Sequence, residues 1–298
     1  MSNTGERIDL PSGESLWYYD EDHSYWRHNP KTGKRGKRLS GVTTVVKTLD
    51  YEPKNLLRWA ARTQCEGVAL LYLESEGEEF LHWLSNADAI WRELEKHGLT
   101  YDNVRDKKGE EGTNTHALAF QALAMGRPVP DFAALSDREK LLAKGVAGFW
   151  LDHDPNASQV EQVVYSPRLG VAGRLDFAGR LNARCDNPIC ACQEAEGIGV
   201  IDLKTGGFIS ASAHAQVGGG YPLLREESGF GESNWAAILQ VFDDGSYEFF
   251  NAESDPERFE NAVKTYRDAG KTNYAAGEAR KARKVFRETE RQIAVAAA

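Results

Sequence analysis

The sequence predicts an α/β protein in which a helical N-terminal half precedes a mixed β-sheet flanked by helices. Apolar residues recur at helical spacing as far as His153, and after Pro155 they alternate with polar residues as strands do. The resulting order of helix, three strands, helix and further strands is that of an α/β core. We therefore expect an N-terminal hairpin and helical region (residues 1–108) and a core with C-terminal helices (residues 109–298).

The composition is that of a globular protein with one large or two small domains. Of the 298 residues, 41% are hydrophobic and 27% charged, which is ordinary for a folded chain. No apolar run reaches the roughly 18 residues of a transmembrane helix, and Met1–Arg7 has no apolar signal segment. Four cysteines in a chain this long differ from a secreted disulfide framework. We expect a cytoplasmic protein with no membrane partner.

The net charge of −9 argues against nucleic-acid binding over the whole surface. A local basic groove is compatible with it, because clustering decides such binding more than the total charge. Two basic clusters occur, and for each a solvated face is an equal alternative to phosphate contact. They consist of Lys31, Lys34, Arg35, Lys37 and Arg38, and of Arg280, Lys281, Arg283, Lys284, Arg287 and Arg291.

The N-terminal part should contain a hairpin followed by helices. Aromatic and polar residues alternate in residues 14–30, which predicts a β-hairpin. A basic loop follows, and residues 39–49 favour a strand that enters a short helix. The polar segment 101–112 is predicted to be a loop. Helical spacing and capping signals predict helices at residues 53–74, 77–97, 112–125 and 136–153.

The core should contain strands joined by short turns. Residues 159–165 and 171–181 flank a turn and predict an antiparallel pair, and a third strand at 198–205 follows a cysteine-bearing loop. The remaining predicted elements are a helix at 210–226, a hairpin at 235–250 around a turn at 243–246, and helices at 255–269 and 274–293.

Candidate catalytic residues lie on two of these strands. Side chains alternate along a strand, so Asp202 and Lys204 point to the same face, and Asp176 belongs to the neighbouring strand. Carboxylates suit a hard divalent cation, and a nearby ammonium can orient water or balance charge on a phosphate. The alternative is an inert, solvated Asp/Lys pair at a strand end.

These residues belong to a longer series of motifs that resembles a nuclease family. The series resembles the RecB-like branch of the PD-(D/E)xK nuclease superfamily, which includes phage exonucleases and CRISPR-associated RecB-like exonucleases. The resemblance covers roughly residues 109–250 and implies a restriction-endonuclease-like core. In chain order the motifs are Gly112-x-x-x-His116, Glu161, Gly173-Arg-Leu-Asp176, Ile201-Asp202-Leu-Lys204, and Gln216 with Tyr221, with a weaker echo in Gly41-Val-Thr-Thr44.

The resemblance assigns roles to individual residues. It implies that Asp176 and Asp202, with the carbonyl of Leu203, bind Mg²⁺ or Mn²⁺, while Lys204 positions or activates the attacking water. His116 would complete or support the metal site, and Glu161 would be a further acid beside it.

Gln216 and Tyr221 match a Q-x-x-x-Y motif whose helix faces nucleic acid. In this chain they are five residues apart rather than four, so they would not stack on one α-helical face. The three glycines between them also weaken a helix. A bulge in the helix would bring the two side chains back to the same face.

The cysteines suggest a second site. Some relatives hold an iron–sulfur cluster through one early and three late cysteines, and Cys65 with Cys185, Cys190 and Cys192 repeats that tally. In those relatives the late cysteines follow the Q-x-x-x-Y helix, whereas here they precede Asp202. The spacing fits neither C-x₂-C zinc nor ferredoxin patterns. An iron–sulfur cluster, a zinc site and free thiols all stay open, and the other histidines, including His153, are interpreted as structural or surface residues.

The expected function is a divalent-metal-dependent DNA nuclease. On family analogy it would be an exonuclease acting at DNA ends in recombination or DNA processing. Its expected partners are DNA, as linear ends or single strands, and a single-strand annealing protein or CRISPR adaptation protein. The sequence is also compatible with a homo-oligomer. If the chain is phage-encoded, its location is the host cytoplasm. The alternatives are an inactive DNA-binding or assembly module that retains the nuclease fold, and a metal-stabilised interaction protein.

Overall fold

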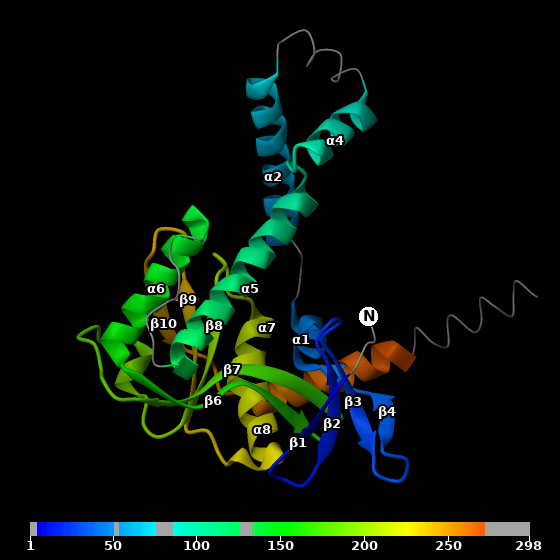
Figure 1. The fold of residues 1–298 in the computed structure, drawn as a ribbon, viewed down its shortest axis with the longest axis vertical. Coiled ribbons are helices and arrows are strands. Elements are labelled where there is room, and N and C mark those ends of the chain that lie inside the picture. Colours follow the sequence, from blue (N-terminus) through cyan, green and yellow to red (C-terminus); the bar gives the residue numbers. More distant parts are fainter. Residues whose placement is uncertain (1–4, 51–53, 76–85, 126–132, 134, 272–298) are drawn as a thin grey trace, which may run out of the picture.

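Two β-sheets organise the protein, with helices around the larger one (Figure 1). The computed structural model describes residues 5–50, 54–75, 86–125, 133 and 135–271. The smaller sheet comes first in the chain and is antiparallel. Its strand order is β1 (Glu6–Asp9), β2 (Ser15–Tyr19), β3 (Ser24–Asn29) and β4 (Lys34–Arg38).

The predicted hairpin of residues 14–30 is confirmed by β2 and β3. The basic loop predicted after it is wrong in part, because Lys34–Arg38 forms strand β4 and pairs with β3. Leu16, Tyr18 and Tyr25 are buried and pack against Tyr165 of the larger sheet. The N-terminal half is therefore less helical than predicted, since a whole sheet precedes its helices.

The larger sheet has six strands and mixes parallel and antiparallel pairs. It runs in the order β10-β9-β8-β7, with β5 and β6 pairing with β7. Pairing is parallel between β8 and β9 and between β5 and β7, and antiparallel elsewhere. The strands are β5 (Ser40–Gly41), β6 (Pro155–Ser166), β7 (Val171–Leu181), β8 (Gly199–Lys204), β9 (Trp235–Val241) and β10 (Tyr247–Asn251). The predicted strands at 159–165, 171–181, 198–205 and in the 235–250 hairpin are thus confirmed.

Helices cover both faces of this sheet, so the predicted α/β class is confirmed. One apolar cluster joins the sheet to α5 (Tyr101–Met125) and α6 (Asp137–His153). A second joins it to α1 (Val42–Val46), α8 (Tyr221–Arg225) and the helix at 256–271. Short helical elements complete the chain: η1 (Lys47–Leu49), η3 (Ala191–Gln193), α7 (Ala211–His214), η4 (Ala215–Gly220) and η5 (Glu226–Phe230).

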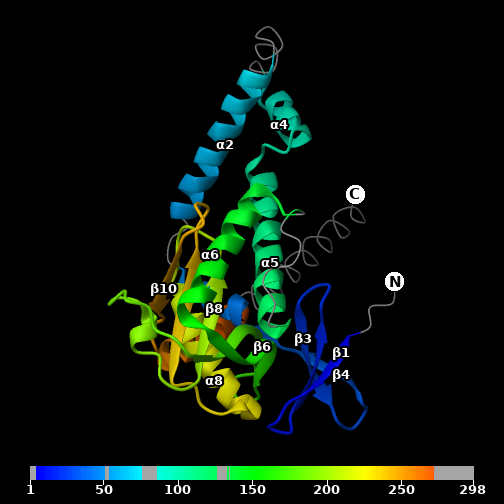
Figure 2. The same ribbon diagram turned by 60° about the vertical axis from the view of Figure 1, so that its left-hand side comes forward.

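Three helices form an arm that projects from the sheets (Figures 1 and 2). The arm consists of α2 (Lys54–Glu74), α4 (Ala87–Lys96) and the first part of α5. The loop predicted at 101–112 is therefore wrong. The segment is polar because it lies in the arm and has no extensive apolar face to bury. Its contacts there include an edge-on contact of Tyr101 with Trp59 and an ion pair between Asp102 and Arg105.

The remaining helix predictions are confirmed where the structure describes them, including 255–269 as the helix at 256–271. Part of the 77–97 prediction, the 274–293 helix and the second basic cluster lie outside the described residues. Among the described helices, none is long and apolar enough to cross a membrane.

Candidate functional site

The candidate site lies where strands β7 and β8 separate. β8 pairs with β7 only along Phe177–Gly179. On the same edge, β5 pairs with β7 at Val171 and Ala172. Between these two pairings, no described strand pairs with β7 on that edge, and Asp176 lies in this gap. The Leu203 N–H of β8 donates to Asp176 Oδ2 at 2.9 Å, so a side chain takes the place of the missing strand pairing.

Asp202 and Lys204 meet Asp176 from β8. Lys204 Nζ lies 2.5 Å from Asp202 Oδ2, which confirms that the two side chains share a face. The pair is not solvated at the Asp202 end, because only 2% of the Asp202 side chain is exposed. Burial alone would lower the pKa of Lys204, yet the carboxylates of Asp202 and Asp176 outweigh it and raise that pKa. Lys204 is therefore a cation at neutral pH.

Helix α5 and strand β6 supply the other two residues. His116 Nδ1 lies 3.3 Å from Asp176 Oδ2. One ligand atom each from His116, Glu161 and Asp176 all lie within 4.8 Å of one another. Glu161 has a left-handed backbone with φ of 49°, unusual for a residue with a side chain. Burial lowers the pKa of His116, which favours a neutral ring with a free lone pair.

The electrostatics of this cluster fit a divalent cation. Burial, together with the nearby carboxylate of Asp202, raises the pKa of Asp176 well above its usual range. The two acids therefore repel each other in the absence of further positive charge, because Lys204 compensates only one of them. Carboxylate oxygens are the donors that Mg²⁺ and Mn²⁺ prefer, and the imidazole of His116 can support the site through Asp176. The fit supports a site for such an ion at Asp176, with Asp202, Glu161 and His116 around it.

A close approach of α5 to β8 explains the glycine four residues before His116. A Cβ atom on Gly112 would lie 2.8 Å from Thr205 Oγ1, immediately after Lys204. Contacts this short are essentially absent from proteins, so a side chain here would require the Thr205 hydroxyl to turn away or α5 to shift. Gly112 thereby permits the close packing of α5, which carries His116, against the end of β8.

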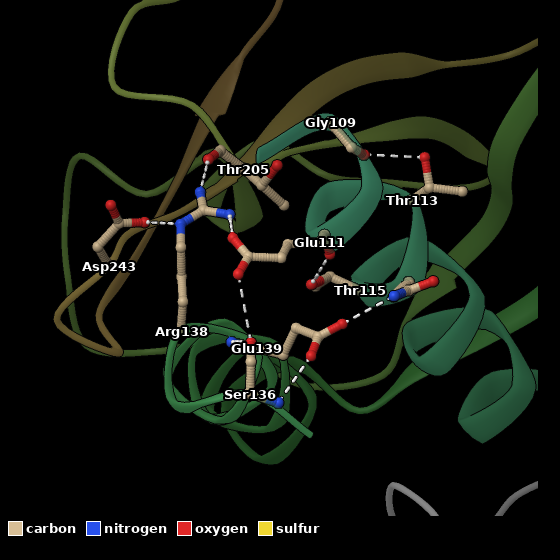
Figure 3. Close-up of polar contacts among 10 residues, drawn as sticks. Gly109, Glu111, Thr113, Thr115, Ser136, Arg138, Glu139, Thr205 and Asp243 are labelled. Carbon is tan, nitrogen blue, oxygen red and sulfur yellow. Dashed lines mark hydrogen bonds and ion pairs between the residues drawn. The ribbon is translucent and has the colours of Figure 1, made fainter. Parts of the chain in front are cut away.

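An arginine that no sequence pattern singles out, Arg138, connects α5, α6 and the end of β8 (Figure 3). Arg138 donates to Glu111 of α5 at 3.1 Å, to the Thr205 carbonyl at 3.0 Å and to Asp243 at 2.9 Å. Its neighbour Ser136 caps α6. These contacts hold the end of β8 beside α5. A lone arginine at a helix start carries no sequence signal for this role, since its partners come from distant segments.

Gln216 and Tyr221 are brought together by a π-helical turn. η4 spans Ala215–Gly220, and its wider turn makes residues five apart neighbours. Gln216 Nε2 donates to the Tyr221 hydroxyl at 2.8 Å, which donates to the Arg174 carbonyl at 2.9 Å. The bulge that would bring the two side chains to the same face is thus present. Both side chains are buried and line the cleft, and their contact with nucleic acid stays a prediction.

The glycines of this turn are required by packing. A Cβ atom on Gly218 or Gly219 would clash with the carbonyl oxygen of Glu253 or Asp255. The turn therefore lies directly against the segment that leads into the helix at 256–271.

The site opens into a large cleft of about 1480 Å³. This exceeds the roughly 300–1,000 Å³ of small-molecule pockets. The N-terminal sheet forms one wall through His23 and Arg38, and α5 forms another through Lys108. Arg174, also missed from the sequence, lines the cleft and pairs with Glu161 at 2.7 Å. The first basic cluster lies on and before β4, and its side chains are exposed beside this wall.

The four cysteines do not form one group. Cys65 is exposed on α2, so its predicted membership is wrong. Cys185, Cys190 and Cys192 instead gather around His153, which had been interpreted as a structural or surface residue. Burial raises the pKa of the Cys190 thiol to about 12 and lowers the pKa of His153. His153 gave no signal because it lies far upstream of the cysteines.

No known protein-family model matches this sequence, and no curated protein matches it either.

Proposed function

We propose that the protein is a divalent-metal-dependent DNA nuclease of the RecB-like PD-(D/E)xK type, with a restriction-endonuclease-like core. The observation that supports this most is the meeting of Asp176, Asp202 and Lys204 where β7 and β8 separate, with His116 and Glu161 beside them. Two carboxylates and an ammonium at one strand gap, open to a cleft, are the groups that phosphodiester hydrolysis needs.

The residues of this cluster would have different roles in the reaction. A divalent cation bound by the carboxylates would polarise the phosphate and lower the pKa of a bound water. Lys204, held as a cation by Asp202, donates hydrogen bonds to a phosphate oxygen or to the attacking water. Its raised pKa supports this positioning role over that of a proton acceptor. Asp176 is fixed by the Leu203 N–H and by His116, which limits its rotation.

A polynucleotide is the substrate class that best suits the cleft. Its volume suits a polymer, and Arg38 of β4 lines it as an exposed cation that can contact a phosphate. Arg35 of β4 also lies over the ring of Trp26 of the neighbouring strand β3 at 4.9 Å, which places a cation and an aromatic ring together on this sheet. The preference for DNA ends rests on family analogy alone.

Digestion of end-labelled linear duplex and single-stranded DNA with Mg²⁺ or Mn²⁺ tests the proposal. The wild type is compared with Lys204→Ala, and with Lys264→Ala as a matched control, since Lys264 is exposed and outside the cleft. We expect metal-dependent loss of label from the wild type and the control only. The labelled end from which products appear gives the polarity.

If wild type and Lys204→Ala both bind DNA and neither cuts with any metal, the catalytic proposal is wrong. A binding module that retains the fold would then be the better account.

A further inference from the structure

Three cysteines and a histidine gather at the far end of the β7–β8 pair, away from the carboxylates. Cys185, Cys190 and Cys192 belong to the loop that joins the two strands, and His153 is the last residue of α6. Cys190, Cys192 and His153 are buried. One ligand atom from each of the four residues lies within 4.8 Å of the others.

The spacing of these atoms matches the edges of a tetrahedron. Zinc binds sulfur at about 2.3 Å and imidazole nitrogen at about 2.0 Å, which sets ligand-to-ligand distances of about 3.5–3.8 Å. The Sγ atoms of Cys185 and Cys192 are 3.7 Å apart, and Cys190 Sγ lies 3.8 Å from His153 Nε2. A disulfide would need a separation of about 2.05 Å.

The imidazole also has an unexplained polar atom. His153 is fully buried, and its Nδ1 has no hydrogen-bond partner among the residues that the structure describes. Its Nε2 lies 3.2 Å from the Tyr247 hydroxyl, which donates to Asp152. Nε2 is the nitrogen that faces Cys190 Sγ, so a metal ion would bind there and leave Nδ1 to carry the ring proton.

We infer that His153, Cys185, Cys190 and Cys192 bind one structural Zn²⁺ ion. Three thiolates and a neutral imidazole are a closed tetrahedral set, and binding releases the three thiol protons. Gln193 Nε2, 3.6 Å from Cys192 Sγ, is placed to donate to a thiolate. In an iron–sulfur cluster the four ligands divide between two iron atoms or among four, whereas these atoms surround a single point.

The ion would fasten the loop to the end of α6. Two backbone bonds already make this connection, from Asn182 N to the Asp154 carbonyl and from Ala183 N to the His153 carbonyl. The loop otherwise has little regular structure beyond η3. Zinc would therefore fix the closed end of the strand pair whose open end has Asp176 and Asp202.

Metal analysis of the full chain tests the inference without any activity measurement. Protein expressed with zinc is passed through a chelator that removes loosely held ions and is then analysed for zinc, iron and sulfide. We expect about one zinc ion per chain in the wild type. Cys185→Ser and His153→Ala should lose it. Cys65→Ser and His97→Ala are matched controls that should retain it, because both residues are exposed and outside the cluster.

Two further measurements keep the result clear. Asp202→Asn should retain the zinc, which excludes binding in the carboxylate cleft. Replacement by Co²⁺ in the wild type should give the strong visible bands of a tetrahedral ion and thiolate charge transfer in the near ultraviolet, whether or not the cysteine variants fold. A wild type without zinc and without these bands overturns the inference, as does iron accompanied by sulfide.

Discussion

Two clusters of candidate ligands lie at opposite ends of one strand pair, and they differ in chemistry and in access. At the open end, carboxylates and a histidine line a cleft of about 1480 Å³. At the closed end, three thiols and a histidine are mostly buried beneath the strand-joining loop. Oxygen ligands with room for water suit an exchangeable Mg²⁺, whereas four sulfur and nitrogen ligands in a closed set suit a permanent Zn²⁺. The contrast indicates that one strand pair can keep the proposed catalytic site apart from the proposed structural one.

The largest expected effect comes from removing one carboxylate at the open end. Asp202→Asn keeps the buried volume but weakens the cation site and frees Lys204 from its partner. We expect cleavage to fall by more than about 100-fold, beyond the 10–100-fold typical of residues that only support a metal ligand. Zinc content and thermal unfolding should stay close to wild type. Equal losses of cleavage and zinc would show that the two ends are not separable.

Metal removal should distinguish the two ends next. A brief treatment with a carboxylate chelator should abolish cleavage reversibly and leave the melting temperature nearly unchanged. A thiol-binding mercurial should release the zinc and lower the melting temperature by about 5 °C or more. Calorimetry with a zinc-sensitive dye measures both. Release of zinc without any change in melting temperature would contradict a structural role.

Arg138→Gln should weaken the open end without reaching the closed one. The change leaves Glu111, only 11% exposed, as a buried charge without its partner. Breaking such a pair costs on the order of 3 kcal/mol in the free energy of unfolding. The double variant Arg138→Gln/Glu111→Gln should recover part of it, as denaturant unfolding would measure. Cleavage should fall in the single variant while zinc content stays constant, and a variant that no longer holds zinc would contradict this.

The pH dependence of stability should report on Asp176. Its pKa is raised in the folded protein by burial and by Asp202, so the folded state holds a proton that the unfolded state has released. Without divalent cation, this group therefore lowers stability as pH rises from the ordinary carboxyl pKa of 3.8 through the raised value. Mg²⁺ should oppose the loss at higher pH. Thermal melts of wild type and Asp176→Asn check this, and an unchanged slope in the variant would assign the effect elsewhere.

The smallest effect should come from the exposed basic cluster around β4, of which Arg38 lines the cleft while Lys31, Lys34 and Lys37 lie outside its lining. Replacing these three lysines together by Gln should weaken DNA binding modestly and leave the catalytic rate on saturating DNA unchanged. For every phosphate that the variant no longer binds, the logarithmic slope of affinity against salt should fall in magnitude by about 0.7–0.9. Fluorescence anisotropy at several salt concentrations measures this. A variant with the same charge change at Arg92, Lys96 and Lys264, all exposed and outside the cleft lining, should keep the wild-type slope.

Periodicity predicted the central strands and the arm helices α2 and α4 well, and the first part of α5 poorly. The strands of residues 155–181 are half-buried or buried. Their burial is reflected in the alternation of apolar and polar residues on which the prediction of these strands rested. The first part of α5 has no such pattern, because its contacts are with α2 in the arm and not with a sheet. Strand β4 was missed for a related reason. It is an edge strand rich in Lys and Arg, which suit solvent and resist further strand pairing.

For the candidate site, short-range motifs were informative and long-range partners were not. The joint position of Asp202 and Lys204 follows from strand geometry, and the structure places them in contact. Arg138 and His153 reach their partners only through the packing of α6 against the sheet. No spacing in the sequence therefore indicates the contacts of these two residues. Cys65 was included by counting cysteines, which ignores where each one lies in the fold.

The π-helical turn between Gln216 and Tyr221 widens the range of spacings at which residues of one helix can pair. Each residue of a regular α-helix advances by about 100°, so side chains five residues apart point in different directions. Here the wider turn brings Gln216 and Tyr221 together, and their side chains form a hydrogen bond. A glutamine and a tyrosine can thus act as one polar unit at a spacing of five, provided that glycines let the turn pack against Glu253 and Asp255.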